Sequence, residues 1–136
     1  MADSNLETVR SALRALKEGD VPGVVRWLAA DVEMIPIRAA MEGTSYRGHD
    51  GFRQFYADIT DDWDDYRPDA EDIRDIGEDR VLVVGKFHGR GKASGVEVET
   101  PAVWVCELRD ARITSVRFYN DEHAALEALG LHEQQG

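Results

Sequence analysis

The stretch 81–119, VLVVGKFHGRGKASGVEVETPAVWVCELRDARITSVRFY, decides the fold. It contains three β-rich runs, at 81–88, 96–108 and 113–119. The joints between them are GRGKASG at 89–95 and Arg109-Asp110-Ala111. Branched and aromatic residues fill the runs and turn-forming residues fill the joints, which is the pattern of antiparallel strands connected by short turns. We therefore expect a meander, which also includes the residues from Tyr66 to a turn at Gly77-Glu78-Asp79.

Helical periodicity dominates the sequence before this sheet. Apolar residues recur at steps of three and four between Ser4 and Gly19, which predicts a first helix. Asp20 is placed to cap a second helix from Val21 to about Ala29, with Pro22 in its first turn. A third helix, from about Asp50 to Asp61, is predicted by the aromatic spacing i, i+3, i+4, i+7 of Phe52, Phe55, Tyr56 and Ile59.

The remaining segments complete an α+β arrangement. VEMIPI at 32–37 predicts a short strand that either lies at the edge of the sheet or ends at Pro36, and 38–48 predicts a loop. Asp121 is placed to cap a last helix that stops at Gly130. Three helices before a sheet and one after it indicate α+β, not alternating βαβ units. We expect a single domain over 1–131 and a frayed tail over 132–136.

The charge balance excludes several classes of partner. Sixteen Lys and Arg against 27 Asp and Glu give a net charge of −11, the wrong sign for nucleic acid or an anionic membrane. No apolar run approaches the roughly 18 residues of a membrane helix. The N-terminus resembles no signal peptide, and Cys106 is the single cysteine, so we expect a cytoplasmic protein without an intrachain disulfide.

Two apparent motifs predict no site. GRGKASG at 89–95 departs from the phosphate-loop pattern and connects two strands, so it predicts a turn. His88 alternates with Lys86 and Arg90, which indicates a solvent-facing or dimer-facing strand surface. No residues recur at metal-ligand spacing, and we expect neither a metal nor a cofactor.

The order of these segments resembles the SnoaL-like branch of the nuclear-transport-factor-2-like superfamily. The resemblance rests on Gly19-Asp20, on TSYRGHDGF at 44–52, on SGVEVETPAVWV at 94–105 and on RITSVRFYND at 112–121. It implies a cone-shaped barrel, in which a curved, mostly antiparallel mixed sheet wraps around the N-terminal helices and encloses a pocket. It also implies that the convex face of the sheet is used for dimerisation.

The catalytic groups of two relatives are absent from the corresponding positions. The resemblance places Ile35 where ketosteroid isomerases have their carboxylate base, Ala12 at their tyrosine and Trp104 at their protonated aspartate. The acid–base set of limonene epoxide hydrolases corresponds to Ala102, Trp104 and Phe118. Neither chemistry has its base or its donors in this chain, so we expect neither activity.

The pocket implied by the resemblance is mainly apolar. If Ile35 faces inward, strand alternation sends Glu33 the same way, which makes Glu33 the candidate acid or base; the alternative is a glutamate exposed at the strand end. Trp104, Phe118 and Tyr56 are candidates either for lining the pocket or for simple core packing, and Asn120 is expected to face inward as a buried amide. The loop residues Arg38 and Tyr46 are expected at the mouth. The full set predicted to line the pocket is Leu16, Leu28, Ile35, Phe52, Phe55, Tyr56, Ala102, Trp104, Val116, Phe118 and Asn120.

Three functions remain open at this stage. One is a cofactor-independent isomerase, cyclase or hydrolase that acts on a small hydrophobic or polyketide-like molecule. The second is a non-catalytic protein that binds a small apolar ligand, and the third is a dimeric interaction module. We also expect a homodimer, because Val103 and Val105 face away from Trp104 and would be exposed on the convex side of the sheet in a monomer.

Overall fold

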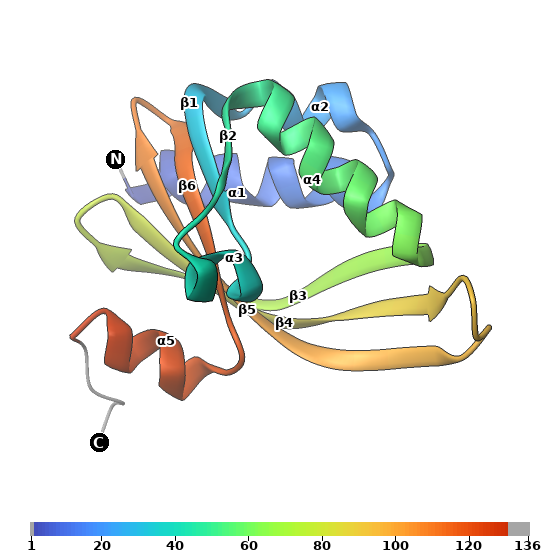
Figure 1. Cartoon of the computed structure of the whole chain (residues 1–136). Coiled ribbons are helices and arrows are strands. Elements are labelled where there is room, and N and C mark those ends of the chain that lie inside the picture. The colour runs from blue at the N-terminus through green and yellow to red at the C-terminus, as the bar shows by residue number, and fades with distance from the viewer. Residues whose placement is uncertain (1, 131–136) are drawn as a thin grey trace.

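A curved six-stranded sheet forms the centre of the computed structural model, which describes residues 2–130 (Figure 1). The strands are β1 (Leu28–Ile35), β2 (Tyr46–Arg47), β3 (Trp63–Gly77), β4 (Arg80–Gly91), β5 (Glu97–Arg109) and β6 (Arg112–Tyr119). Their order across the sheet is β2-β1-β6-β5-β4-β3. The strands from β3 to β6 form the predicted antiparallel meander, whereas β1 runs parallel to β6. The α+β class with a curved sheet is therefore confirmed.

Two tight turns connect the long strands of the meander. Glu78 and Asp79 between β3 and β4, and Asp110 and Ala111 between β5 and β6, all have φ between 52° and 59°. Consecutive left-handed residues match the right-handed twist of hairpin strands. Both turns also contact the first helix: the Asn5 side-chain amide donates to Asp79 Oδ1 at 3.1 Å, and the Thr8 hydroxyl donates to the Ala111 carbonyl at 3.1 Å.

Two long helices lie against one face of the sheet, as Figure 1 shows. They are α1 (Ala2–Lys17) and α4 (Gly48–Asp62), and the short α2 (Val21–Val25) joins the first of them to β1. Asp20 caps α2 as predicted, accepting from the Gly23 amide at 3.0 Å. Val9 of α1 and Phe52 of α4 are each 1% exposed, so the main core lies between these helices and the sheet. None of the described helices is long and apolar enough to cross a membrane.

The last helix, α5 (Glu122–Ala128), covers the opposite face of the sheet. Val103 and Val105, which we expected to be exposed there, are 2% and 4% exposed because they pack with Leu82, Ala125 and Leu126 under this helix. The argument for a dimer from these two valines is therefore wrong. The homodimer itself stays a prediction.

The sequence misplaced the boundaries around β1. Leu28 and Ala29, predicted to end the second helix, belong to β1 because pairing with β6 overrides helix propensity: the Trp27 carbonyl accepts from the Ile113 amide at 2.9 Å, and Leu28 lies opposite Ile113. Pro36 ends this strand and begins α3 (Ile37–Glu42), a helix within the predicted loop. The predicted tail, residues 132–136, lies outside the described residues.

Candidate functional site

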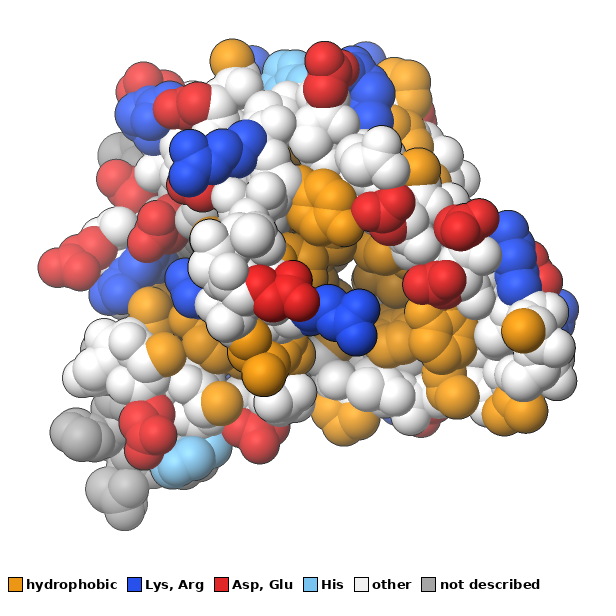
Figure 2. Space-filling model, in the orientation of Figure 1, with side chains coloured by type: hydrophobic (Ala, Val, Ile, Leu, Met, Phe, Trp, Pro, Cys, Tyr) orange, Lys and Arg blue, Asp and Glu red, His pale blue; other side chains and the backbone are white. Residues whose placement is uncertain are grey.

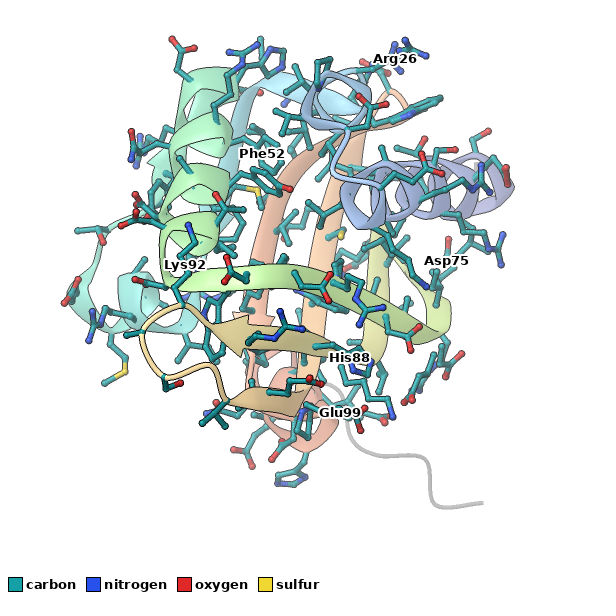
Figure 3. All side chains as sticks on the ribbon, turned by 90° about the vertical axis from the view of Figure 1, so that its right-hand side faces the viewer. Arg26, Phe52, Asp75, His88, Lys92 and Glu99 are labelled. Carbon is teal, nitrogen blue, oxygen red and sulfur yellow. The ribbon has the colours of Figure 1, made fainter. Side chains whose placement is uncertain are left out.

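An apolar cavity lies between the sheet, α1 and α4. This inner cavity has a volume of about 60 Å³. It is lined by Val9, Ala12, Leu13, Leu16, Val24, Leu28, Met34, Phe52, Phe55, Tyr66, Val83, Trp104, Cys106, Ile113, Val116 and Phe118. Figure 3 shows Phe52 pointing from α4 into the space between that helix and the strands. The inner cavity exists because small and branched residues face large rings across this space without filling it.

A second, larger cavity lies beside the first one and shares four lining residues with it. This outer cavity has a volume of about 290 Å³. Small-molecule sites typically range from about 300 to 1,000 Å³, so the cavity is close to the lower end of that range. Phe55, Tyr66, Trp104 and Phe118 line both cavities. The other residues around the outer cavity are Pro36, Ile37, Ile59, Trp63, Phe87, Thr100, Pro101, Ala102, Tyr119 and Asn120.

A row of aromatic rings connects the surface with the interior. The ring centroids of Tyr46 and Phe55 are 5.5 Å apart, those of Phe55 and Phe118 5.7 Å, and those of Phe118 and Trp104 6.1 Å. The first and last of these pairs are edge-to-face, which is a favoured geometry for aromatic rings. The row therefore lines the way from the mouth to the interior with aromatic side chains whose planes are turned against one another.

The entrance to the cavities is acidic. The mouth, a surface hollow of about 450 Å³ beside the outer cavity, is lined by Tyr46 and by four charged residues: Arg38, Glu42, Asp58 and Asp62. Asp58 accepts a hydrogen bond from the Tyr46 hydroxyl at 2.6 Å and one from the Gln54 amide at 2.7 Å. These two donors hold the pKa of Asp58 below its usual range, so its charge is present at neutral pH. Figure 2 shows hydrophobic side chains around an opening at the centre of this face, with both acidic and basic side chains beside it.

The few polar groups inside are neutral. Burial raises the pKa of the Cys106 thiol to about 12. The pKa of Tyr66 is also raised to about 12, mainly by burial and to a smaller extent by the nearby Tyr56. Trp104 is 5% exposed; its indole N–H has no hydrogen-bond partner within residues 2–130, and its nitrogen is not sealed off by protein atoms. No carboxylate or imidazole of the described chain lines the inner cavity. The interior therefore offers hydrogen-bond donors but no base that functions near pH 7.

Comparison with known proteins identifies the family. The family model of the SnoaL-like domain matches residues 9–116. The chain belongs to the SnoaL-like domain family. No curated protein matches this SnoaL-like chain.

Solved structures share the fold of this SnoaL-like domain. An NTF2-like protein of unknown function from Burkholderia pseudomallei superposes with a TM-score of 0.78 at 22% identity, over 91% of this chain and 95% of that one. TerC, co-crystallised with polyporic acid, gives a TM-score of 0.77 at 21% identity, over 93% and 98%. A putative polyketide cyclase from Xanthomonas campestris gives 0.73 at 21% identity, over 93% and 96%. At these identities the likeness shows the nuclear-transport-factor-2-like fold.

Most residues that we expected around the pocket of the SnoaL-like domain do lie there. The inner cavity is lined by Leu16, Leu28, Phe52, Phe55, Trp104, Val116 and Phe118, and the outer one also by Ala102 and Asn120. Arg38 and Tyr46 lie at the mouth. Whether these residues contact a ligand remains a prediction.

The expected inward face of β1 is wrong. Val32 and Met34 are buried against the core, so Ile35 and Glu33 point away from the cavities. The Glu33 carboxylate accepts from the Ser45 hydroxyl at 3.0 Å and lies 3.6 Å from the Arg47 guanidinium. Glu33 is thus part of a surface ion pair beside β2, and the structure does not place it for catalysis inside the cone.

Two further expectations need correction. Tyr56 lines neither cavity but packs beside Phe52, with ring centroids 6.4 Å apart. Asn120 is exposed at the rim of the outer cavity and makes no hydrogen bond to Trp104, because β6 ends at Tyr119 and the chain turns outward before α5. Asn120 is therefore not the buried amide that we expected.

Sequence reasoning missed several lining residues. Val9, Leu13, Met34, Val83 and Ile113 line the inner cavity, and each belongs to an apolar stripe that the sequence shows. The signal for Met34 was the alternation of Val32 and Met34 with the charged residues around them. Tyr66, which lines both cavities, had no signal because it stands in a run rich in Asp and Arg.

The outward surface of the long strands carries a charged ladder. Lys86 and His88 of β4 lie between acidic residues of both neighbouring strands: His88 is 3.1 Å from Glu99 and 3.7 Å from Asp69, and Lys86 is 3.3 Å from Glu99. Figure 3 shows His88 and Glu99 close together on this surface. Because the charges of the ladder pair among themselves, it is explained by cross-strand stabilisation.

Proposed function

We propose that this SnoaL-like protein binds one small, mainly apolar molecule in the inner and outer cavities. The observation that carries the proposal is that two neighbouring cavities share four aromatic lining residues, Phe55, Tyr66, Trp104 and Phe118. Concave apolar sites with a few convergent polar groups are typical of small-molecule binding. The row of rings favours an apolar ligand, because aromatic side chains offer a large apolar surface for contact.

The chemistry of the lining supports binding more than acid–base catalysis. Cys106 and Tyr66 are the titratable residues of the inner cavity, and both stay protonated near neutral pH. A general base must lie within hydrogen-bond reach of the proton that it abstracts, and the carboxylates of this region are at the mouth. Catalysis by this chain would have to use Asp58, Asp62 or Glu42 on the part of a ligand nearest the solvent.

A fluorescent apolar probe tests the proposal directly. N-phenyl-1-naphthylamine is uncharged and gains fluorescence in apolar surroundings, so titration measures its Kd. Ala102→Phe places a ring in the outer cavity and should weaken binding at least tenfold. Val96→Phe adds the same ring at a side chain that is 57% exposed and lines neither cavity nor the mouth, and it should leave the Kd unchanged.

Two outcomes would contradict the proposed function. The first is the absence of a saturable fluorescence increase with the unaltered protein. The second is equal probe affinity in the Ala102→Phe and Val96→Phe variants, with thermal melts showing that both are folded, since the probe would then bind elsewhere on the surface.

A further inference from the structure

We propose that the ligand of this cavity carries a hydrogen-bond acceptor at its inner end and an uncharged or cationic group at its outer end. This inference rests on the proposed function and names the class of molecule that the site takes. Two independent features carry it: an unpaired donor in the interior and an excess of carboxylates at the mouth.

The inner end is defined by Trp104. An indole N–H is a donor only, so it is satisfied by an oxygen or nitrogen lone pair and by no apolar group. Trp104 is 5% exposed, has no partner within residues 2–130, and lies where the two cavities meet. Its nitrogen is accessible and not enclosed by protein atoms, so a ligand carbonyl or ether oxygen can reach it and accept its hydrogen bond. Tyr66 lines the same two cavities and carries a hydroxyl as a second candidate donor.

The outer end is defined by the charges of the mouth. Glu42, Asp58 and Asp62 supply three carboxylates there and Arg38 one guanidinium. The partners of Asp58 are the neutral Tyr46 and Gln54 side chains, so its charge is hydrogen-bonded without being neutralised. An anionic group would enter this field at a cost, whereas an amine would be attracted.

Aromatic rings next to these carboxylates strengthen the preference for a cation. Trp63 and Phe87, with ring centroids 5.6 Å apart, and Tyr66, 5.4 Å from Phe87, surround the outer cavity. Trp63 also lines the mouth together with Asp58 and Asp62. Ring faces attract organic cations, and Trp does so most strongly. The net charge of −11 acts in the same direction at long range.

The outer-end inference is tested with two probes that differ by one charge. 1-Anilinonaphthalene-8-sulfonate is N-phenyl-1-naphthylamine with an added sulfonate, so the ratio of their Kd values isolates the effect of a negative charge. We expect the neutral probe to bind at least tenfold more tightly at low salt. The ratio should fall at least threefold in the double variant Asp58→Asn with Asp62→Asn. It should not change in Asp50→Asn, which removes a charge from the first turn of α4, away from the mouth.

The inner-end inference is tested with two naphthalenes of similar size. 2-Acetonaphthone carries a carbonyl acceptor and 2-ethylnaphthalene does not, and each is titrated as a competitor of the bound neutral probe. We expect the ketone to compete at least fivefold better with the unaltered protein. Trp104→Phe keeps a ring but removes the N–H, so it should bring the ratio of the two affinities close to one.

The outcomes separate the two proposals. If the neutral probe does not bind, the proposed function fails. If the neutral probe binds but the sulfonate binds equally well or better, ligand binding stands and this inference is overturned. The same holds if the ketone does not bind more tightly than 2-ethylnaphthalene, or if Trp104→Phe leaves the ratio of their affinities unchanged.

Discussion

Truncation of Trp104 distinguishes a ligand cavity from a filled core. Replacing a fully packed aromatic residue with alanine costs about 3–5 kcal/mol. Trp104 is nearly buried, but it lines both cavities, so we expect it to make fewer contacts than a fully packed ring of its size. Its edge-to-face contact with Phe118 accounts for roughly 0.5–1.5 kcal/mol of the loss. We expect Trp104→Ala to lower the free energy of unfolding by about 2–3 kcal/mol, and the Tm by about 6–12 °C.

Urea unfolding followed by far-UV circular dichroism measures this loss without relying on tryptophan emission. The matched control is Leu82→Ala, because Leu82 is 0% exposed and lies under α5, away from both cavities. Leu82→Ala should lower the free energy of unfolding by about 3–5 kcal/mol, which is as much as or more than Trp104→Ala, although Trp104 is the larger residue. A loss above about 4 kcal/mol for Trp104→Ala, together with unchanged affinity for N-phenyl-1-naphthylamine, would refute the reasoning, since the ring would then be packed core.

Three further predictions concern the thiol, a turn and the surface glutamate. Because burial raises the pKa of Cys106, the free energy of unfolding should fall by about 1.4 kcal/mol per pH unit as the pH rises from 9 toward 12. Urea melts at pH 8 and 10 should show a smaller fall in Cys106→Ala than in the unaltered protein, and an equal fall in the two proteins would contradict the assignment. Ala111→Gly should raise the free energy of unfolding by about 0.5–1 kcal/mol, because the φ of Ala111 is 59°, a left-handed conformation that glycine adopts more easily. The control Ala57→Gly, inside the helix α4, should lower it by about 1 kcal/mol, and thermal melts that show both variants destabilised would disprove the prediction. Glu33→Gln should leave the Kd of N-phenyl-1-naphthylamine unchanged, and a tenfold weaker Kd would place Glu33 at the ligand after all.

The sheet was predictable because its signals are local. The runs at 81–88 and 113–119 fall within β4 and β6, the run at 96–108 differs from β5 by one residue at each end, and the expected joints overlap the observed turns. Branched residues favour strands and short turn motifs favour turns within a few positions along the chain, so neighbouring residues alone predict where these strands and turns lie. The caps Asp20 and Asp121 were predictable for the same reason, since each side chain bonds an amide three residues later.

The inward face of β1 was predicted wrongly because the resemblance outweighed the strand pattern. Alignment at Pro36 placed Ile35 inward, and Glu33 followed it by alternation. Val32 and Met34 are the apolar members of the other alternating set, and they are the residues that the structure buries. An irregularity in the β1–β6 register between Leu28 and Glu33 shifts the strand relative to its neighbour, and the sequence of β1 does not specify it.

The covering of the convex face depends on contacts that are distant in sequence. Val103 and Val105 predict an apolar patch, but the side chains that bury it are Leu82 of β4 and those of Ala125 and Leu126 in α5. Arg74 of β3, 2.9 Å from Glu122, adds an ion pair to the same helix. The cap at Asp121 and the stop at Gly130 predicted α5, but they did not specify the face of the sheet against which the helix packs.

The parallel pairing of β1 with β6 determines when the cavity forms during folding. Met34 lies opposite Val116, so this ladder joins the first third of the chain to its last quarter, whereas the meander from β3 to β6 requires only pairing between consecutive strands. Contacts between distant parts of a chain form slowly, because loop closure must precede them. We therefore expect the meander to assemble first and β1 to dock late. A ligand that touches Met34 and Val116 would then slow unfolding more than it accelerates folding.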